Sequence, residues 1–426
     1  MQITSQKHSS SQRRGNVAVM TAVGLVAMMG VVALSLDGGA MFAERRHSQS
    51  ASDAAALAAA SELFENYWLL SGEDYFNTAK NSALDVAKDN GYANDGITST
   101  VTVNVPPTSG FYKDKRGYAE VIIESKFKRG FSAIFGGGDI SIKSRAVAVG
   151  TPIAADVGIL VLDPDMRSAL NSQGSGTTDV NGTPVIVNST HSEATVVGGG
   201  GFLKADKFFL TGSYVVNGSG GSLEGKLYLN RPPTPDPLAD LPPPDPNKLI
   251  IRSFKKIQYT SGSMTLEPGV YTGGINVSGT GNLTLKPGIY YMDGGGFSFS
   301  GQGSLYGPEV MVYNAPGNGN SHGISVTGQG SMILSGPTSG PYQGLTFFQE
   351  RTSNVTGNVA GTGGETSITG TFYFAGALLK IAGNGGVANL GSQYISRELY
   401  LGGNGDINVE WSPDKVARSR AIHLVE

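Results

Sequence analysis

An uncharged, apolar run over residues 16–36 constrains this chain more than any other feature of its sequence. A helix needs about 20 consecutive apolar residues to cross the hydrocarbon core of a bilayer. We therefore predict one transmembrane helix over residues 16–36. A cleaved signal peptide is the rival interpretation, because Ala-rich sites lie nearby. The run is longer than a typical signal-peptide core, however, and it continues into a helical pattern.

The charges beside this run predict its orientation. Lys7, Arg13 and Arg14 precede the run and Asp37 follows it. The positive-inside rule places residues 1–15 in the cytoplasm as a short tail. We therefore expect a single-pass membrane protein with its C-terminal bulk outside the cytoplasm.

The helical pattern continues beyond the apolar run. Residues 49–60, Gln-Ser-Ala-Ser-Asp-Ala-Ala-Ala-Leu-Ala-Ala-Ala, have very high helix propensity. A single long helix from the membrane to about Asn66 is the expected result. Its small side chains allow close packing, either within this chain or against another membrane helix.

Residues 12–62 contain five distinctive features in succession. They are Arg13-Arg14-Gly15, the apolar helix, Leu36-Asp37-Gly38-Gly39, Arg45-Arg46 and residues 49–60. This combination resembles the N-terminus of TadG-like proteins of the Flp/Tad pilus-assembly group. The resemblance implies an inner-membrane anchor that supports tight-adherence pili, with other pilus-assembly or pilin-like proteins as partners through the N-terminal helix.

The resemblance has one departure. Pilin-like members that a prepilin peptidase processes usually carry Glu five residues after the cleaved glycine. Met20 occupies that position here, counted from Gly15. The departure counts against cleavage after Gly15 and against a role for this chain as a pilus subunit.

Residues 37–150 are predicted to form a helical stalk and a small pilin-like α+β domain. Residues 74–90 space their apolar side chains as a short amphipathic helix, which Gly91 ends. Residues 98–105, 118–127 and 140–149 have the alternation of strands. The likeness to pilins at this level is one of fold layout alone.

From residue 151 onward, short β-rich runs alternate with glycine turns. Glycine makes up 62 of the 426 residues, about twice the usual share. A loose motif recurs at steps of 22, 27, 55 and 20 residues, and the step of 55 has room for two repeats. The clear copies are Ser278-Gly279-Thr280-Gly281, Ser300-Gly301-Gln302-Gly303, Thr327-Gly328-Gln329-Gly330, Ala382-Gly383-Asn384-Gly385 and Gly402-Gly403-Asn404-Gly405, with weaker ones at Gln173-Gly174-Ser175-Gly176 and Asn217-Gly218-Ser219-Gly220.

These repeats favour a right-handed parallel β-helix, a solenoid, over residues 151–426. In such a fold, each strand–turn–strand unit forms one coil and glycine occupies the corners. A β-sandwich or jelly roll is the competing architecture, because it also uses many short strands. Residues 231–247 are rich in proline and must run extended. We expect a strap along the solenoid there, and the alternative is a ligand for a partner that binds polyproline.

Composition excludes several classes of function. The chain has no cysteine, so disulfides, thiolate metal sites and cysteine nucleophiles are excluded. The formal net charge is −3 with both signs spread along the chain, which does not favour nucleic acid. No cofactor is expected.

Parallel β-helices often host glycan-cleaving enzymes, which need carboxylates gathered on one face. The acidic residues between 248 and 410 are few and fall at no equivalent positions in consecutive copies. These acidic residues are Glu267, Asp293, Glu309, Glu350, Glu365, Glu398, Asp406 and Glu410. We therefore assign no catalytic residue.

Three other features superficially resemble binding sites. One is a segment that follows a strand as the metal loop of von Willebrand A domains does, Asp163-Pro164-Asp165-Met166-Arg167. It lacks the serines of that loop, so we expect a turn and assign no metal. The histidines His8, His47, His191, His322 and His423 are scattered without ligand spacing. The aromatic residues Tyr290, Tyr291, Phe372, Tyr373, Phe374 and Trp411 fit sugar stacking, but core packing is favoured.

The function predicted from the sequence is therefore non-catalytic. The chain is expected to be a membrane-anchored envelope protein that supports assembly or display of Flp/Tad-type pili and surface adhesion. Two alternatives are a glycan-binding adhesin module, which needs exposed aromatic residues in a row, and a membrane-tethered polysaccharide-active enzyme, which needs clustered carboxylates.

Overall fold

The computed structural model describes residues 13–131, 133, 138–218, 220–315, 322–362 and 366–426, with side chains from residue 17 onward. Residues 1–12, which make up most of the predicted cytoplasmic tail, and Ser219 of the last weak repeat lie outside these ranges. The chain divides into two compact units. The stalk unit comprises residues up to Thr151 together with Ala421–Glu426, and the solenoid unit comprises Pro152–Arg420.

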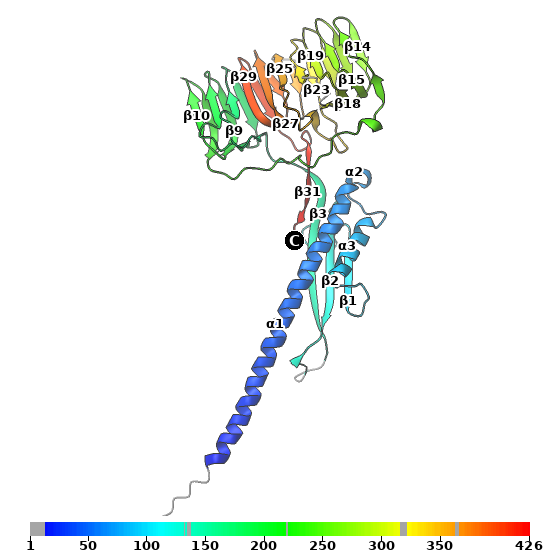
Figure 1. Ribbon diagram of the computed structural model, residues 1–426, viewed down its shortest axis with the longest axis vertical. Helices are drawn as coiled ribbons and strands as arrows, with labels where there is room; N and C mark the ends of the chain where they lie inside the picture. The colour runs from blue at the N-terminus through cyan, green and yellow to red at the C-terminus, as the bar shows by residue number, and fades with distance from the viewer. Residues whose placement is uncertain (1–12, 132, 134–137, 219, 316–321, 363–365) are drawn as a thin grey trace, which may run out of the picture. The chain divides into compact units, whose positions relative to one another are not determined.

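The stalk unit combines one long helix with a small sheet (Figure 1). The helix α1 (Arg13–Glu65) is continuous, which confirms the predicted long helix. Two short helices follow, α2 (Tyr67–Leu70) and α3 (Thr78–Asp89). The sheet has the order β1-β2-β3-β31, and its strands are β1 (Ser99–Asn104), β2 (Tyr118–Phe127), β3 (Ile140–Ala154) and β31 (Arg418–Leu424).

The second half of α1 packs closely because its inner face carries small side chains. Ala55 and Ala59, one helical turn apart, are completely buried, and so are Ala79 and Ala83 of α3. The backbone of β3 approaches just as closely, since a Cβ at Gly150 would lie 1.9 Å from the Ala60 carbonyl oxygen. Glycine is therefore required where α1 crosses the end of this strand.

The last residues of the chain correct the predicted domain boundary. The sequence assigned everything from 151 to 426 to the solenoid, but Ala421–Glu426 belongs to the stalk unit. The backbone N–H groups of Val425 and Glu426 both donate to the carbonyl oxygen of Val147. The free edge of β3 therefore recruits the C-terminal segment, because an unpaired edge exposes backbone groups that need partners.

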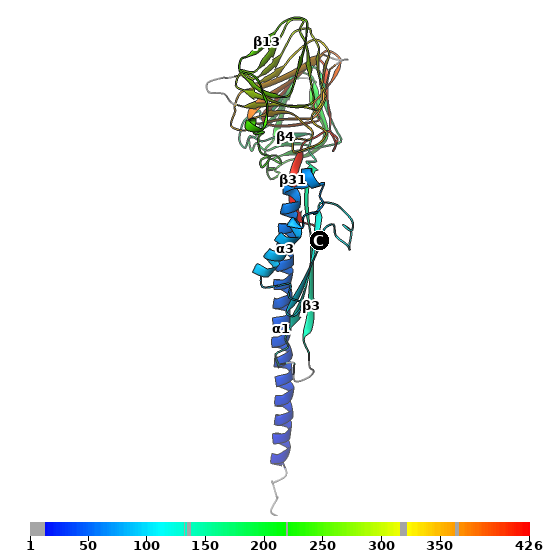
Figure 2. The same ribbon diagram turned by 90° about the vertical axis from the view of Figure 1, so that its right-hand side faces the viewer.

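The solenoid unit is a parallel β-solenoid of about 11 turns, as predicted, and not a β-sandwich. Figure 2 looks along the stack of coils. Each coil contributes strands to three faces, and every strand pairs in parallel with its counterparts in neighbouring coils. Between Tyr228 and Ile251 the described residues include one short 3-10 helix, η2 (Pro246–Lys248).

Each of the three faces is a stack of short strands, with at most one from each coil. In stacking order, the first face contains β12 (Ile251–Ser253), β15 (Gly269–Thr272), β18 (Gly288–Asp293), β21 (Val310–Ala315), β24 (Leu345–Gln349), the start of β27 (Thr371–Asn384), the start of β29 (Gln393–Gly403), β4 (Ile159–Val161), β7 (Val185–Val187) and the ends of β9 (Phe202–Leu210) and β11 (Ser222–Tyr228). The second contains β13 (Ile257–Tyr259), β16 (Ile275–Val277), β19 (Phe297–Phe299), β22 (Ile324–Val326), β25 (Gly357–Thr362), the ends of β27 and β29, β5 (Leu170–Ser172), β8 (Thr195–Gly198) and β10 (Tyr214–Asn217). The third contains β14 (Ser263–Leu266), β17 (Asn282–Leu285), β20 (Leu305–Gly307), β23 (Met332–Leu334), β26 (Thr366–Ile368), β28 (Val387–Leu390), β30 (Asp406–Glu410), β6 (Thr177–Asn181) and the starts of β9 and β11.

The order of coils in the stack differs from their order in the chain. The last coil pairs with the first, since β29 pairs with β4 and β5, and β30 pairs with β6. We call this junction the seam. The chain thus enters the stack at the seam, winds outward to β10 and β11, crosses to the opposite end at β12, and winds back to the seam. Figure 1 shows β10 and β14 at opposite ends with β29 between them.

A ladder of glycines explains the recurring sequence motif. A Cβ at Gly301 would lie 2.3 Å from the Gly279 carbonyl oxygen, and one at Gly403 would lie 2.0 Å from that of Gly383. The ladder continues across the seam, where a Cβ at Gly174 would lie 2.2 Å from the Gly403 oxygen. The 55-residue step contains one unrecognised corner, because Gly361 pairs with Gly383 in register.

The proline-rich strap, residues 231–247, runs along the first face over several coils. Near one end, the Asn188 side chain exchanges two hydrogen bonds of 2.8 Å with the backbone of Thr234. Further along, Arg351 donates to the carbonyl oxygens of Leu238 and Leu241. Leu238 is itself buried in an apolar cluster on the outer side of this face.

Because the first and last coils are neighbours at the seam, a direct link between them should be able to replace the strap as the connection between the two halves of the solenoid. In the native chain, two residues separate β28 from β29, and Val157-Gly158 would separate β30 from β4 if Glu410 were joined to Val157. A permuted solenoid that runs from 251 to 410 and then from 157 to 228, without the strap, should fold. We expect it to be less stable by about 2–5 kcal/mol, because the apolar cluster under Leu238 becomes exposed.

Circular dichroism and denaturant unfolding, with residues 152–420 in native order as the control, measure this difference. An unfolded permuted chain beside a folded control would show that the coils cannot pair at the seam without the strap.

Candidate functional site

The first candidate site is the apolar half of α1. Over residues 17–36 nearly all the large apolar side chains are exposed, and Met20 exposes 74% of its surface. By length and composition this segment is able to cross a membrane. Water would penalise such a continuous apolar surface, whereas a bilayer would not. The segment therefore has the properties of a single membrane anchor.

The polar side chains in this half of the helix are accommodated locally. Thr21 Oγ1 donates to the Val17 carbonyl oxygen at 2.8 Å, and Ser35 Oγ donates to the Val31 oxygen at 2.8 Å. These bonds satisfy the hydroxyl groups within the helix itself. This matters in lipid, where an unsatisfied polar group costs several kcal/mol.

The small-residue face in the Ala-rich half of α1 packs within the chain and not against another membrane helix. Ala51, Ala55 and Ala59 lie in the core of the stalk unit, with α3 and the sheet. Ser48 and Ser52 bond the hydroxyl of Ser144 on β3 at 2.6 and 2.7 Å. This face is therefore occupied by the stalk unit itself.

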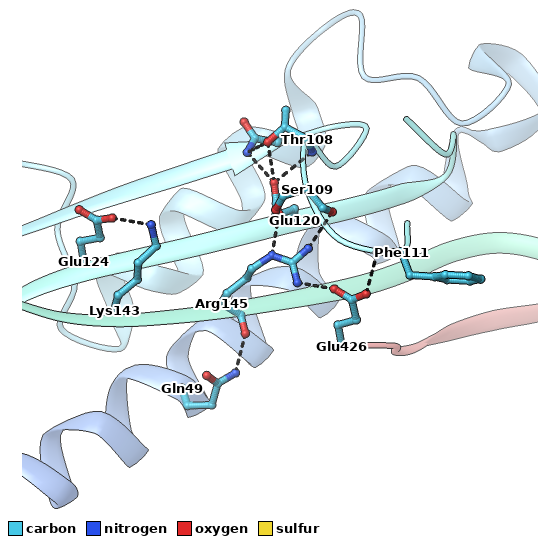
Figure 3. Close-up of polar contacts among 10 residues, drawn as sticks. Gln49, Thr108, Ser109, Phe111, Glu120, Glu124, Lys143, Arg145 and Glu426 are labelled. Atoms are coloured by element: carbon cyan, nitrogen blue, oxygen red, sulfur yellow. Dashed lines mark hydrogen bonds and ion pairs between the residues drawn. The ribbon is translucent and has the colours of Figure 1, made fainter. Parts of the chain in front are cut away.

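The second candidate site is a charge network on the other side of the stalk sheet (Figure 3). Glu120 is completely buried, and its Oε1 accepts from Arg145 Nε at 2.7 Å. Arg145 also forms an ion pair with the side chain of the C-terminal residue, Glu426. A second oxygen of Glu426 accepts from the Phe111 backbone N–H at 3.1 Å. The network thus holds the C-terminus against β3 and the 104–111 loop.

The environment of Glu120 stabilises its ionised form. Burial alone raises the pKa of its carboxyl group, but the hydrogen bonds from Ser109, Asn104 and Arg145 outweigh burial. They lower the pKa to about 2 from an ordinary value of 4.5. The hydrogen bond from Arg145 likewise lowers the pKa of Glu426. Arg145 thus holds the carboxyl groups of Glu120 and Glu426 together beside β3.

The sequence carries no local signal for this network. In β2 the apolar side chains of Val121 and Ile123 face the helix, which places Glu120 on the opposite face. The alternation alone predicts that this opposite face is exposed to solvent. Nothing in the sequence indicates that the 104–111 loop and Glu426 cover it, because both contacts are long-range.

The aromatic residues proposed for sugar stacking are mostly core residues. Tyr290, Phe372, Tyr373 and Phe374 are buried, whereas Tyr291 is half-buried. Phe372 stacks against Phe347 and Tyr394 inside the coils, with ring centroids 4.8 and 5.5 Å apart. Trp411 is partly buried and donates to the Ala155 carbonyl oxygen at 3.1 Å. Core packing is thus confirmed for the four buried residues.

The carboxylates of the solenoid are distributed over different coils. Glu267 pairs with Lys286, Glu410 pairs with Lys415, and Asp406 accepts from the Thr177 backbone. Glu365 lies outside the described residues. A depression of about 400 Å³ on the second face, lined by Ser298, His322, Ser325 and Asn358 among others, contains no carboxylate. The lining of this depression therefore lacks the carboxylate pair that glycosidases use.

Asp163 ends its strand in a turn, as expected. Its Oδ1 accepts from the backbone N–H groups of Asp165 and Met166. Its Oδ2 accepts from Arg397 Nε at 2.8 Å across the seam. Burial raises the pKa of this carboxyl group, but the hydrogen bond from Arg397 outweighs burial and keeps the pKa below its ordinary value. The side chain thus joins the first coil to the last.

The described histidines do not converge. His191 Nδ1 accepts from the Glu193 backbone N–H, and His47 lies against the ring of Tyr92. His322 and His423 lie in different units, and His8 lies outside the described residues. Within the described ranges, no group of three or more histidine, aspartate or glutamate side chains is placed to hold a metal ion.

Comparison with known proteins identifies one segment. Residues 15–62 match the family model described as Flp pilus-assembly TadE/G-like. The match confirms the resemblance inferred from the N-terminus, and it covers the membrane segment and the buried half of α1. No curated protein and no solved structure matches the chain.

The Glu120 network predicts that the stalk unit loses stability in acid. A carboxyl group with a lowered pKa contributes stability above its ordinary value of 4.5, and this stability disappears as the pH falls to about 2. Glu120→Gln should remove this contribution to the pH dependence and lower the free energy of unfolding at pH 7 by about 1.5–3 kcal/mol, because Arg145, Asn104 and Ser109 lose a charged acceptor.

Fluorescence of Trp68 during denaturant unfolding in detergent, in a Trp411→Phe background, reports the stalk unit. Glu124→Gln is the matched control, since Glu124 and its partner Lys143 are exposed on the same two strands and contribute about 0–1 kcal/mol. Equal losses for the two variants would contradict the proposed role of Glu120.

Proposed function

We propose that this chain supports the assembly or display of Flp/Tad-type pili as a non-catalytic protein of the cell envelope. Residues 16–36 would anchor it in the inner membrane, with residues 1–15 in the cytoplasm and both compact units outside. The observation that carries the proposal is the match of residues 15–62 to the pilus-assembly family. The exposed apolar surface over the same residues supports the anchoring step.

The solenoid would supply the interaction surface of the protein. Its coils form an extended, rigid scaffold whose apolar side chains are largely buried inside. Repeat scaffolds of this kind commonly act through broad surfaces rather than through one deep pocket. Pilus-assembly proteins, pilin-like proteins and envelope glycans are the partners that this surface would contact, and surface adhesion would depend on it.

The non-catalytic part of the proposal rests on the distribution of charged groups. Three of the described carboxylates, Glu267, Glu410 and Asp163, each pair with a lysine or arginine, and they lie on different coils. A glycoside hydrolase of the common type uses two carboxyl groups across one bond. Incubation with envelope polysaccharides should therefore release no oligosaccharide, and a product would revive the enzyme alternative.

A gene deletion complemented in trans tests the assembly role. Loss of surface pili, counted by electron microscopy, and loss of adhesion should both be restored by the intact chain. A form with a cleavable signal peptide fused to residue 37, which is exported but not anchored, should fail to restore them. Replacing 16–36 with an unrelated transmembrane helix is the control that separates anchoring from specific helix contacts.

Each outcome of this experiment is informative. Restoration by the unanchored form would show that the membrane helix is dispensable for function. Pili and adhesion that persist after deletion would overturn the assembly role altogether.

A further inference from the structure

A second structural element of the stalk unit lies where α1 would leave the membrane. The hairpin of β2 and β3 pairs as far as Phe127 and Ile140, and beyond this pair the chain approaches α1. The Phe131 backbone N–H donates to Asp37 Oδ1 at 3.1 Å. Asp37 is the first charged residue after the apolar run. The hydrogen bond therefore places Phe131 at the level of the bilayer surface.

The Asp37 side chain lies close to the backbone at Gly130. A Cβ at Gly130 would lie 2.9 Å from Asp37 Oδ1, so the absence of a side chain there permits the contact. Ala33, one turn before Asp37, is buried in a helix segment that is otherwise almost entirely exposed. Gly130 and Phe131, at the described end of the hairpin, are thus held against α1 at this height.

The side chains at this tip suit a lipid surface. Phe131 exposes 58% of its surface, Lys126 and Lys128 are exposed, and Arg129 is half-buried. The ion pairs among the described residues do not include Lys126 or Lys128. Aromatic rings favour the interfacial region of bilayers, and lysine and arginine bind anionic headgroups.

The opposing charges near the tip are few and mostly engaged. Asp37 accepts from Phe131, and Glu124 pairs with Lys143 at 2.9 Å. Asp139 is the remaining exposed carboxylate of the hairpin end. Residues 124–143 carry two carboxylates against four cations, so the end of the hairpin itself is positively charged.

We propose that Lys126, Lys128, Arg129 and Phe131 form a second membrane contact. They would bind anionic phospholipid headgroups of the leaflet from which α1 emerges. The inference rests on the proposed anchoring of α1. The partner is the bilayer itself, because α1 already brings the hairpin tip to it and the charges are complementary.

This contact would have a consequence for orientation. A single transmembrane helix can rotate about its own axis and tilt within the bilayer. A second attachment beside the helix removes that freedom for the stalk unit. The sheet would then present a fixed side to neighbouring molecules in the plane of the membrane.

The experiment uses the full chain in vesicles of phosphatidylglycerol or phosphatidylcholine, with headgroup-labelled quenching lipid. Because the native chain has no cysteine, single fluorophores can be placed by substitution. Asp139→Cys reports the hairpin end. Tyr75→Cys is the distant control, since it follows the far end of α1, roughly 40 Å along the helix from Asp37.

Phosphatidylglycerol vesicles should quench the fluorophore at 139 several-fold more strongly than the one at 75. The combined change Lys126→Gln, Lys128→Gln and Arg129→Gln should abolish the difference between the two lipids. Phe131→Ser should reduce quenching in both lipids. The matched change Lys113→Gln and Lys115→Gln, which removes exposed charge elsewhere in the unit, should have no effect.

Flotation of the same samples separates the two proposals. Protein that floats with the vesicles but shows equal quenching at 139 and 75, or no response to the charge variant, overturns the hairpin contact and leaves the anchor intact. Protein that fails to float overturns the membrane anchor itself.

Discussion

The pairing of the C-terminal strand with β3 is the constraint on which the rest of the topology depends. Because β3 leads into the solenoid and β31 follows it, the chain must enter and leave the stack of coils at neighbouring points. A solenoid wound in simple chain order would separate its ends by about 11 coil spacings, roughly 50 Å. The seam between the first and last coils removes this separation, and Asp163 and Arg397 join the two coils directly.

The seam makes a long connection such as the strap necessary. A stack entered at an internal point needs one long return connection, and residues 231–247 provide it. Proline is suited to this role because it keeps the chain extended and removes backbone donors that would otherwise seek partners. The carbonyl oxygens that remain are partly satisfied by Arg351 and Tyr342. The connection thereby also covers apolar side chains on the outer side of the first face.

The sequence predicted local structure well and long-range order poorly. The long helix, the stalk strands and the glycine corners depend on nearby residues, so the apolar run and the spacing of motifs such as Ser300-Gly301-Gln302-Gly303 sufficed. The seam depends on contacts between residues more than 200 positions apart, for example Gly174 and Gly403. Both belong to copies of one motif, but a repeat shows that coils stack without showing which coils are neighbours. The Glu120 network was missed for the same reason, since Glu426 covers it from the other end of the chain.

The two halves of α1 show how one helix serves two surroundings. In residues 17–36, valine, leucine and methionine face outward on all sides, which suits a solvent without polar groups. From Ser48 to Ala60, the buried side chains of the inner face are all alanine or serine, because the sheet and α3 must approach the helix closely. The change occurs between Asp37 and Ser48, at the height where the hairpin tip meets the helix. The helix therefore transmits the position of the membrane directly to the folded stalk, with no flexible joint among the described residues to absorb it.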